Sequence, residues 1–328
     1  MTVLVAGGTG FVGSALCADL VTAGHDVLCL SRSGQAPPGT TALVGDVTRP
    51  SFGLDRASLE RVRRQVTHIV LSAGSVDWGI GPSATMSIHG AGTDNALALA
   101  RSLANLERVV LVSSVLVMGK ARRPVANRDL HVGQDFRNWY EYGKYLAEAQ
   151  VRSSGLPYRV VRFGPVLGGP LPWGVGPSGG MLAAVPLLVQ GYPVHLARGG
   201  RFPAYVCDVT TAAAVLAAAL DAPQGDNIWT WFDPSLPTLS DVFVALTTPW
   251  NVLPRIVDAP VIGRLGRAVA GRLATPRELF AYAEPWLDLA PEILAPVPQP
   301  WPEPSPNYLA QTAIFYRQRL ARSGMAGV

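Results

Sequence analysis

The chain has 328 residues, of which 48% are hydrophobic, and a formal net charge of +4. This composition can bury a large core and excludes disorder of the whole chain. The basic residues are scattered, so we interpret them as solvated surface charges and expect no nucleic-acid partner. The three cysteines are far apart in the sequence, which argues against a disulfide framework and favours a reducing cytoplasm.

The sequence predicts neither a secretory leader nor a membrane span. It opens with the short apolar run Thr2–Ala6, with no charged segment before it and no cleavage pattern after it. The longest apolar stretches, Met181–Val189 and Thr211–Leu220, fall short of the roughly 18 residues that a spanning helix needs. We therefore expect a cytoplasmic protein.

The first half of the chain alternates short β-branched or Leu-rich runs with stretches of helical period. The predicted strands are Thr2–Ala6, Asp26–Ser31, Ala42–Val44, His68–Ser72, Arg108–Ser113 and Tyr158–Arg162. The predicted helices are Phe11–Ala23, Ser58–Arg64, Thr85–Leu103 and Asn138–Ser153. This order predicts an α/β fold with a doubly wound Rossmann-type parallel sheet, in which ligands bind at the carboxyl ends of the strands.

Beyond Phe163 the pattern is irregular, and glycines and prolines crowd residues 164–177, which indicates a loop shaped around a ligand. We expect the extended run Pro203–Val206, a helix over Val209–Leu220 and a strand over Asn227–Phe232 to rejoin the sheet. The predicted division is a Rossmann domain of residues 1–165 plus about 203–233. A smaller C-terminal substrate domain would contain about 166–202 plus 234–328, with a Pro-rich strap at 285–306 and a last helix over Tyr308–Ala321.

The run Gly7-Gly8-Thr9-Gly10-Phe11-Val12-Gly13 follows the first strand and opens the first helix. Its glycines allow a tight turn and the close backbone approach that a pyrophosphate requires, and the helix N-terminus then faces the phosphates. This context predicts dinucleotide binding by the loop, through Gly7, Thr9, Gly10, Phe11, Val12 and Gly13.

The end of the second predicted strand favours NADP(H) over NAD. An NAD site usually has an acidic residue there, whereas this strand ends in Ser31 and Arg32. Arg32 suits a 2′-phosphate that Ser31 or Ser33 also hydrogen-bonds, although a plain surface arginine is the alternative interpretation.

Two further segments are expected to hold the adenosine. Asp46, followed by Val47, is placed to accept from the adenine amino group, and Ser72-Ala73-Gly74 would pass the adenosine ribose. Ordinary turn residues are the alternative for both.

Tyr140 and Lys144, one of only two lysines, are four residues apart in a predicted helix, so their side chains share a face. A phenol and an ammonium so placed can form an acid–base pair, because the ammonium favours the phenolate and lowers the phenol pKa. Tyr142 lies on a different face and is interpreted as packing.

With these motifs and Ser113-Ser114 in this order, residues 1 to about 245 resemble the extended short-chain dehydrogenase/reductase superfamily. Residues 45–50 with Gly53-Leu54, and then residues 74–78, look like the male-sterility branch that contains thioester reductases and fatty acyl-CoA reductases.

The resemblance implies a role for each matching residue. Tyr140 would be the general acid or base, Lys144 would activate it and hold the nicotinamide ribose, and Ser114 would orient the substrate oxygen, with Ser113 as its competitor. The loop with Pro165 and Val166 would flank the nicotinamide. Glu148 matches a carboxylate common in the family and is a candidate for a structural ion pair.

Two positions depart from the family pattern. Gly143 stands where Ser or Thr usually precedes the lysine, which predicts a locally looser helix, since glycine costs about 1 kcal/mol relative to alanine in a helix interior. His89 stands where an Asn is usual, which puts the contact of that Asn in doubt. The other histidines share no metal-ligand spacing, so no metal is assigned.

The sequence thus predicts an NADPH-dependent oxidoreductase that reduces a carbonyl or thioester carbonyl of an apolar, metabolite-sized substrate. We expect an apolar substrate because tryptophans, which suit ligand pockets, recur in the second half of the chain. They are Trp173, Trp229, Trp231, Trp250, Trp286 and Trp301. The alternatives are a nucleotide-sugar epimerase or dehydratase with bound NAD, and a non-catalytic NADP(H)-binding sensor. A homodimer through the helices near Thr85 and Asn138 is common for the fold.

Overall fold

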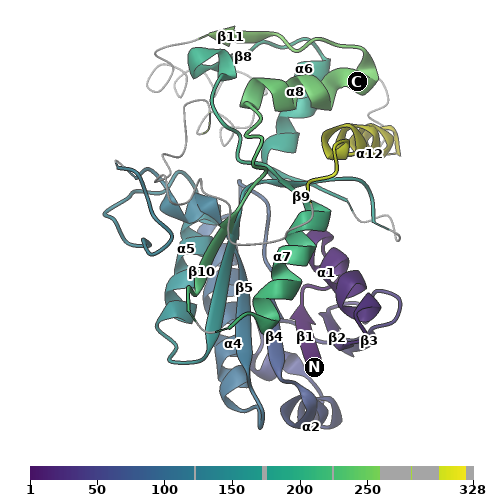
Figure 1. Ribbon diagram of the computed structural model, residues 1–328, viewed down its shortest axis with the longest axis vertical. Helices are drawn as coiled ribbons and strands as arrows, with labels where there is room; N and C mark the ends of the chain where they lie inside the picture. Colours follow the sequence, from purple (N-terminus) through teal and green to yellow (C-terminus); the bar gives the residue numbers. More distant parts are fainter. Residues whose placement is uncertain (122, 172–175, 224, 259–281, 283–302, 323–328) are drawn as a thin grey trace.

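The computed structural model describes residues 1–121, 123–171, 176–223, 225–258, 282 and 303–322. Its central element is a seven-stranded sheet with strand order β10-β6-β5-β4-β1-β2-β3 (Figure 1). All pairings in this sheet are parallel. The strands are β1 (Thr2–Ala6), β2 (Asp26–Ser31), β3 (Thr41–Val44), β4 (His68–Leu71), β5 (Arg108–Ser114), β6 (Tyr158–Phe163) and β10 (Ile228–Trp231). The predicted doubly wound sheet is confirmed, and the predicted strand over 227–232 does join it.

Alternate side chains of the strands enter two separate cores, because successive residues of a strand point to opposite faces. Val3 and Val5 of β1 pack with α1 (Phe11–Thr22) and α7 (Val209–Asp221). Leu4 and Ala6 pack with α2 (Arg56–Gln65), α4 (Gly92–Arg101) and α5 (Trp139–Arg152). Burial on both faces explains why the strands read as continuous apolar runs.

The predicted helix Thr85–Leu103 is divided into three pieces. A short α3 (Pro82–Thr85) is followed by the π-helical turn η2 (Met86–Ala91) and then by α4. A π turn widens the helix locally and is frequent at functional sites. Here it carries the buried His89.

Helix α5 begins with an N-cap, because the Asn138 side chain accepts a hydrogen bond from Glu141 N at 3.0 Å. This cap satisfies one of the free N–H groups of the first turn. Since Tyr140 lies in that turn, the cap also fixes the position of the phenol relative to the sheet.

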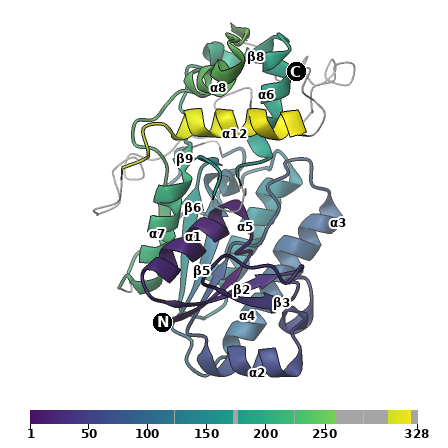
Figure 2. The ribbon, with the colours of Figure 1, turned by 90° about the vertical axis from the view of Figure 1, so that its right-hand side faces the viewer.

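A group of elements lies beyond the carboxyl ends of the sheet strands, and we call it the cap region (Figures 1 and 2). It contains α6 (Val185–Val189), β8 (Val194–Leu196), α8 (Leu239–Thr247), β11 (Ile256–Asp258) and α12 (Tyr308–Arg322). β8 and β11 pair in parallel. The predicted last helix is confirmed as α12, which crosses above the sheet in Figure 2.

The extended run predicted at Pro203–Val206 does not form a strand. Pro203 makes only an isolated bridge with Thr238, and Tyr205 has a φ of +48°, which is incompatible with continued extension. The pairing starts at β9 (Cys207–Asp208), which runs parallel to β7 (Val166–Leu167).

Side chains of α12 hydrogen-bond to several other segments, and Arg317 Nη1, for example, donates to Pro249 O at 2.7 Å. Thr312 Oγ1 accepts from Gly168 N at 2.7 Å, and the Tyr308 hydroxyl donates to Asp233 at 2.9 Å. Most of the predicted Pro-rich strap, residues 285–302, lies outside the described residues. No helix in the described part of the chain is long and apolar enough to cross a membrane.

Candidate active site

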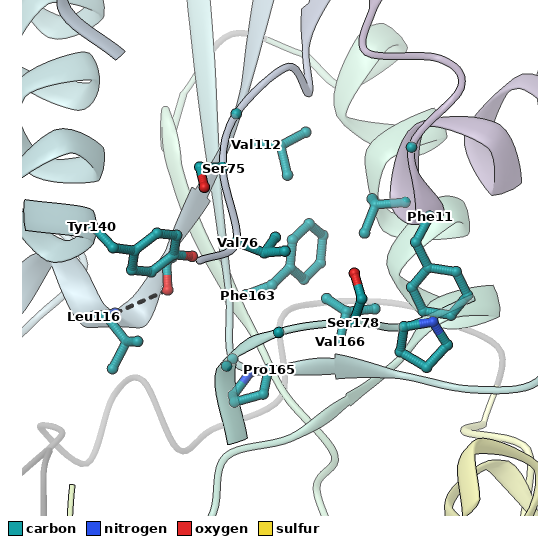
Figure 3. A pocket seen from close by; sticks show the side chains of 18 of the residues that line it. Phe11, Ser75, Val76, Val112, Leu116, Tyr140, Phe163, Pro165, Val166 and Ser178 are labelled. Carbon is teal, nitrogen blue, oxygen red and sulfur yellow. Dashed lines mark hydrogen bonds between the residues drawn. The ribbon is translucent and has the colours of Figure 1, made fainter. Parts of the chain in front are cut away.

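A cavity of about 350 Å³ opens at the carboxyl ends of the strands (Figure 3). Its walls come from the start of α1, the loop after β4, the end of β5, helix α5 and the segments 163–167 and 176–182. The polar groups at its base are Ser113, Ser114, Tyr140 and Lys144. The predicted Ser, Tyr and Lys therefore border one space, although 30 positions separate the first from the last in the sequence.

Close packing explains the glycines at the start of α1. A Cβ at Gly7, whose φ is +90°, would stand 2.5 Å from Ala73 N, and a Cβ at Gly13 would overlap Gly7 O. Helix α1 begins at Phe11 with no side-chain cap, so its first N–H groups have no intrahelical partner. Phe11 and Val12 line the cavity, and a helix start of this kind suits a phosphate.

Of the predicted adenosine-binding residues, Ser72 and Gly74 line this cavity, whereas Ser31, Arg32 and Asp46 do not. Val47 and Ala73 line a second, smaller cavity. Arg32 is exposed just after β2, while the buried Ser31 already donates its hydroxyl to Gln35 O at 2.6 Å. Asp46 accepts from Thr48 N at 2.9 Å and from Thr48 Oγ1 at 2.8 Å. These hydrogen bonds, with the nearby charge of Arg32, hold the Asp46 pKa below its usual value. Asp46 thus has a turn-forming role, and contact of these residues with a cofactor stays a prediction.

The two candidate serines have different partners. Ser113 donates to Glu148 Oε2 at 2.9 Å, and the fully buried Glu148 also binds Arg162 Nη2 at 2.5 Å and Arg152 Nη1 at 3.3 Å. Glu148 therefore forms a structural ion pair and engages the Ser113 hydroxyl. Ser114 instead hydrogen-bonds Tyr140, and its Oγ accepts from Leu116 N at 3.2 Å. The dashed line at Leu116 in Figure 3 marks the second of these bonds.

Tyr140 is only 8% exposed, and burial raises its pKa to about 12. The hydrogen bond with Ser114 opposes this shift, and the neighbouring Glu141 carboxylate adds to it. The shift is the reverse of the lowering expected from Lys144, because the loss of water around a buried phenolate outweighs other contributions. Tyr140 is therefore a neutral phenol at pH 7, the form that can donate a proton.

Lys144 reaches the same base from the next turn of α5. Its Nζ donates to Val112 O at 3.1 Å, and burial lowers its pKa to about 8. An ammonium with this pKa is still largely charged at pH 7.

His89 and Gly143, the two departures from the family pattern, are in contact. A Cβ at position 143 would stand 2.7 Å from His89 Cδ2 and 2.9 Å from Thr85 Cγ2. Burial, with the charge of Lys144 as a second cause, lowers the His89 pKa to about 3, so the ring is neutral. Helix α5 runs unbroken past Gly143.

Two aromatic groups border the first turn of α5. Tyr142 packs on Phe136 and Trp139, with ring centroids 5.5 Å apart in each pair, as its packing assignment predicts. Tyr282, which sequence reasoning did not select, lies 4.1 Å from the Trp78 ring and donates its hydroxyl to Glu141 Oε1 at 2.8 Å. No sequence signal could have found a contact that joins residues 141 positions apart.

Sequence reasoning also missed most of the cavity wall. The glycine-rich character of the segment after Phe163 indicated a ligand loop but not which residues face the space. The apolar side chains found there come from four separate segments: Val76, Trp78, Leu116, Leu167, Met181 and Leu182.

The fold and this site define a Rossmann-type protein of the extended short-chain dehydrogenase/reductase class, as the sequence resemblance indicates. The chain belongs to the NAD dependent epimerase/dehydratase family, because the sequence pattern of that family matches residues 3–225.

Two curated relatives match parts of the chain. A 2-alkyl-3-oxoalkanoate reductase of Stenotrophomonas maltophilia is 35% identical over 161 residues, which are 46% of each protein. An NRPS-like oxidoreductase, fscA, of Fusarium equiseti is 24% identical over 197 residues, 52% of this chain and 18% of that protein. The match covers less than half the length of these relatives.

Solved structures resemble the whole chain. The terminal R domain of the myxalamid PKS-NRPS pathway has a TM-score of 0.74 at 17% identity, with 99% of this chain and 91% of that one covered. MoeE5 in complex with UDP-glucose and NAD has a TM-score of 0.68 at 18% identity, with coverage of 98% and 100%. At such identities the likeness shows the fold alone.

Proposed function

We propose that this chain is an NADPH-dependent reductase of a carbonyl or thioester carbonyl in an apolar, metabolite-sized substrate. One observation carries the proposal: the cavity joins a buried Ser–Tyr–Lys group to the start of α1, under walls that are mostly apolar. The reductase names of the curated relatives support the same chemistry.

The glycine loop fits a bound dinucleotide, because a Cβ at Gly7 or Gly13 would meet the backbone of Ala73 or of Gly7 and open the tight turn that precedes the helix start. In this proposal Gly7–Gly13 and the α1 start hold the pyrophosphate, and Lys144 holds the nicotinamide ribose. Pro165 and Val166 flank the ring, and both line the cavity. The bound cofactor supplies a hydride.

The protein's own residues handle the proton. Ser114 orients the carbonyl oxygen by a hydrogen bond, and the neutral Tyr140 gives its proton to that oxygen as the carbon accepts the hydride. The product of a ketone or aldehyde is an alcohol, and solvent returns a proton to Tyr140. For a thioester, the same addition gives a hemithioacetal, which releases the thiol and leaves an aldehyde.

The substrate side of the cavity favours an apolar ligand. Among the described residues that line it, Lys144 is the one charged side chain. A nucleotide sugar would bring a diphosphate, which usually takes arginine or lysine partners beyond the catalytic lysine. This argues against the epimerase or dehydratase alternative, although MoeE5 in the same fold binds UDP-glucose.

The proposal also covers the choice of cofactor and the regions of the chain that would bind cofactor and substrate. Arg32 directly follows β2, where an NAD site usually has an acidic residue, and this supports NADPH over NADH. The sheet region, residues 1–165 with about 203–233, would bind the cofactor. The cap region, within about 166–202 plus 234–328, would bind the substrate.

A cofactor-consumption assay tests this function. Purified protein is given NADPH and a panel of aldehydes, ketones and acyl thioesters with apolar chains. We expect substrate-dependent oxidation that Tyr140→Phe lowers by about 10³-fold while NADPH binding is kept. Tyr142→Phe is the matched control, since that ring only packs on neighbouring aromatics. Full activity in Tyr140→Phe contradicts the proposal, and binding without turnover across the panel favours the sensor alternative.

A further inference from the structure

The imidazole of His89 lies in a narrow space between two backbone segments. On one side, a Cβ at Gly143 would stand 2.7 Å from Cδ2 and 3.0 Å from Cγ. On the other side, a Cβ at Gly74 would stand 3.0 Å from Cε1. These distances are shorter than ordinary carbon contacts, so the ring fits only because both neighbours are glycines.

The ring also borders the Lys144 ammonium. The Cβ position of Gly74 that lies 3.0 Å from His89 Cε1 is 3.4 Å from Lys144 Nζ, so both groups border one small volume. His89 and Lys144 together line a second cavity of about 20 Å³. Lys144 also lines the main cavity, so the His89 ring bounds the lysine side chain on one side.

The shape of the imidazole matters more than its hydrogen bonds. His89 is 2% exposed, and within the described part of the chain its buried Nε2 has no hydrogen-bond partner. Its low pKa keeps it uncharged beside Lys144. A neutral ring without a bond at Nε2 acts on its neighbour chiefly by filling space.

We infer that His89 is a positioning residue for Lys144: its ring, held between Gly74 and Gly143, confines the ammonium to the position where Nζ bonds Val112 O. Gly143 is then a requirement of the ring and not a weakness of the catalytic helix. The expected effect on turnover rests on the proposed function, in which Lys144 is a catalytic residue. The packing of the ring against Gly74 and Gly143 does not depend on that function.

Kinetics of two substitutions test the positioning role. His89→Ala removes the ring, and we expect kcat to fall about tenfold while the KM for the carbonyl substrate stays within about twofold. His89→Phe restores a flat ring without nitrogens, and kcat should return to within about threefold of the unchanged enzyme. A kcat in His89→Ala within twofold of the unchanged enzyme overturns the inference. So does a His89→Phe enzyme that is folded and as slow as His89→Ala, because the nitrogens would then matter.

A double-mutant cycle tests the packing of the ring without any substrate. Gly143→Ala should lower the thermal midpoint clearly when His89 is present and much less in the His89→Ala background. Thr85→Ser is the matched control, because it removes the other atom near Gly143, the Cγ2 methyl at 2.9 Å. If Thr85→Ser rescues Gly143→Ala and His89→Ala does not, the methyl is the relevant contact and the inference is wrong.

The two proposals fail in distinguishable ways. If Lys144→Ala keeps full activity, the proposed mechanism is wrong, whatever the stability cycle gives. If Lys144→Ala is inactive but His89→Ala and Gly143→Ala act additively, the mechanism stands and the positioning role is overturned.

Discussion

The two ends of the cavity differ in the groups that form their walls. At the α1 end the wall combines a glycine turn, in which a Cβ at Gly7 or Gly13 would meet backbone, with the first N–H groups of the helix and the residues Phe11 and Val12. At the α5 end it consists of buried side chains whose pKa values are shifted by loss of water. The first end should therefore depend on shape and the second on pH.

The largest effect expected on cofactor binding comes from adding one carbon to the glycine turn. Gly13→Ala places a Cβ against Gly7 O, so the loop must open, and NADPH affinity should fall by at least about 100-fold, or ~2.7 kcal/mol. Gly225→Ala is the control, because a Cβ there meets nothing within 4 Å. Titration of NADPH by fluorescence measures both. Unchanged affinity in Gly13→Ala would mean that the glycine turn does not hold the cofactor.

The side-chain end should respond to pH. The Lys144 pKa of about 8 means that the ammonium is lost as pH rises through 8, so kcat/KM should fall about tenfold per pH unit above that value. Lys144→Arg should remove this fall, since a guanidinium stays charged, although with lower activity. A profile that is flat from pH 7 to 10 in the unchanged enzyme contradicts the assignment.

The same pKa affects stability with a definite sign. Between about pH 8 and the unfolded value near 10.5, the unfolded chain binds more protons at Lys144 than the folded chain does. The contribution of this group to the free energy of unfolding therefore rises with pH in that window. Below pH 8 the ammonium is buried in its charged form, so the loss of water around it lowers the free energy of unfolding by its full amount.

The smallest effect is expected at the exposed Arg32. Arg32→Ala should weaken NADPH binding about tenfold and leave NADH binding unchanged, because only NADPH carries the 2′-phosphate. Arg49→Ala is the matched control, since Arg49 is also exposed and also acts on the Asp46 carboxylate. Equal losses for both cofactors would show that Arg32 contributes only general positive charge.

The parts predicted from sequence are those that local patterns determine. The strands and the glycine turn follow from apolar runs and from the turn residues between them. The observed ends of the strands agree with the predicted ends within one residue. The π turn at Met86–Ala91 was missed because it leaves the apolar periodicity of the flanking helices intact. Pro203–Val206 was expected to rejoin the sheet and does not, because composition does not reveal whether a partner strand is present.

The chemistry of the site was only half predictable for a related reason. Ser114 was preferred over Ser113 by resemblance, whereas the physical reason, the bond from Ser113 to Glu148, needs the fold. The expected fall in the Tyr140 pKa counted the ammonium but not the burial, which sequence does not give. His89 and Gly143 were read as separate irregularities, since 54 positions hide their contact.

The hydrogen bond from Tyr282 to Glu141 has a consequence for anyone who shortens this chain. Glu141 follows the proposed proton donor directly, is fully buried and is bonded by Arg137 as well as by Tyr282. Truncation before residue 282 would leave this carboxylate with one partner fewer and remove the ring that covers Trp78. A cofactor-binding fragment prepared in isolation would thus carry an altered first turn of α5, so its proton chemistry would not represent that of the whole chain.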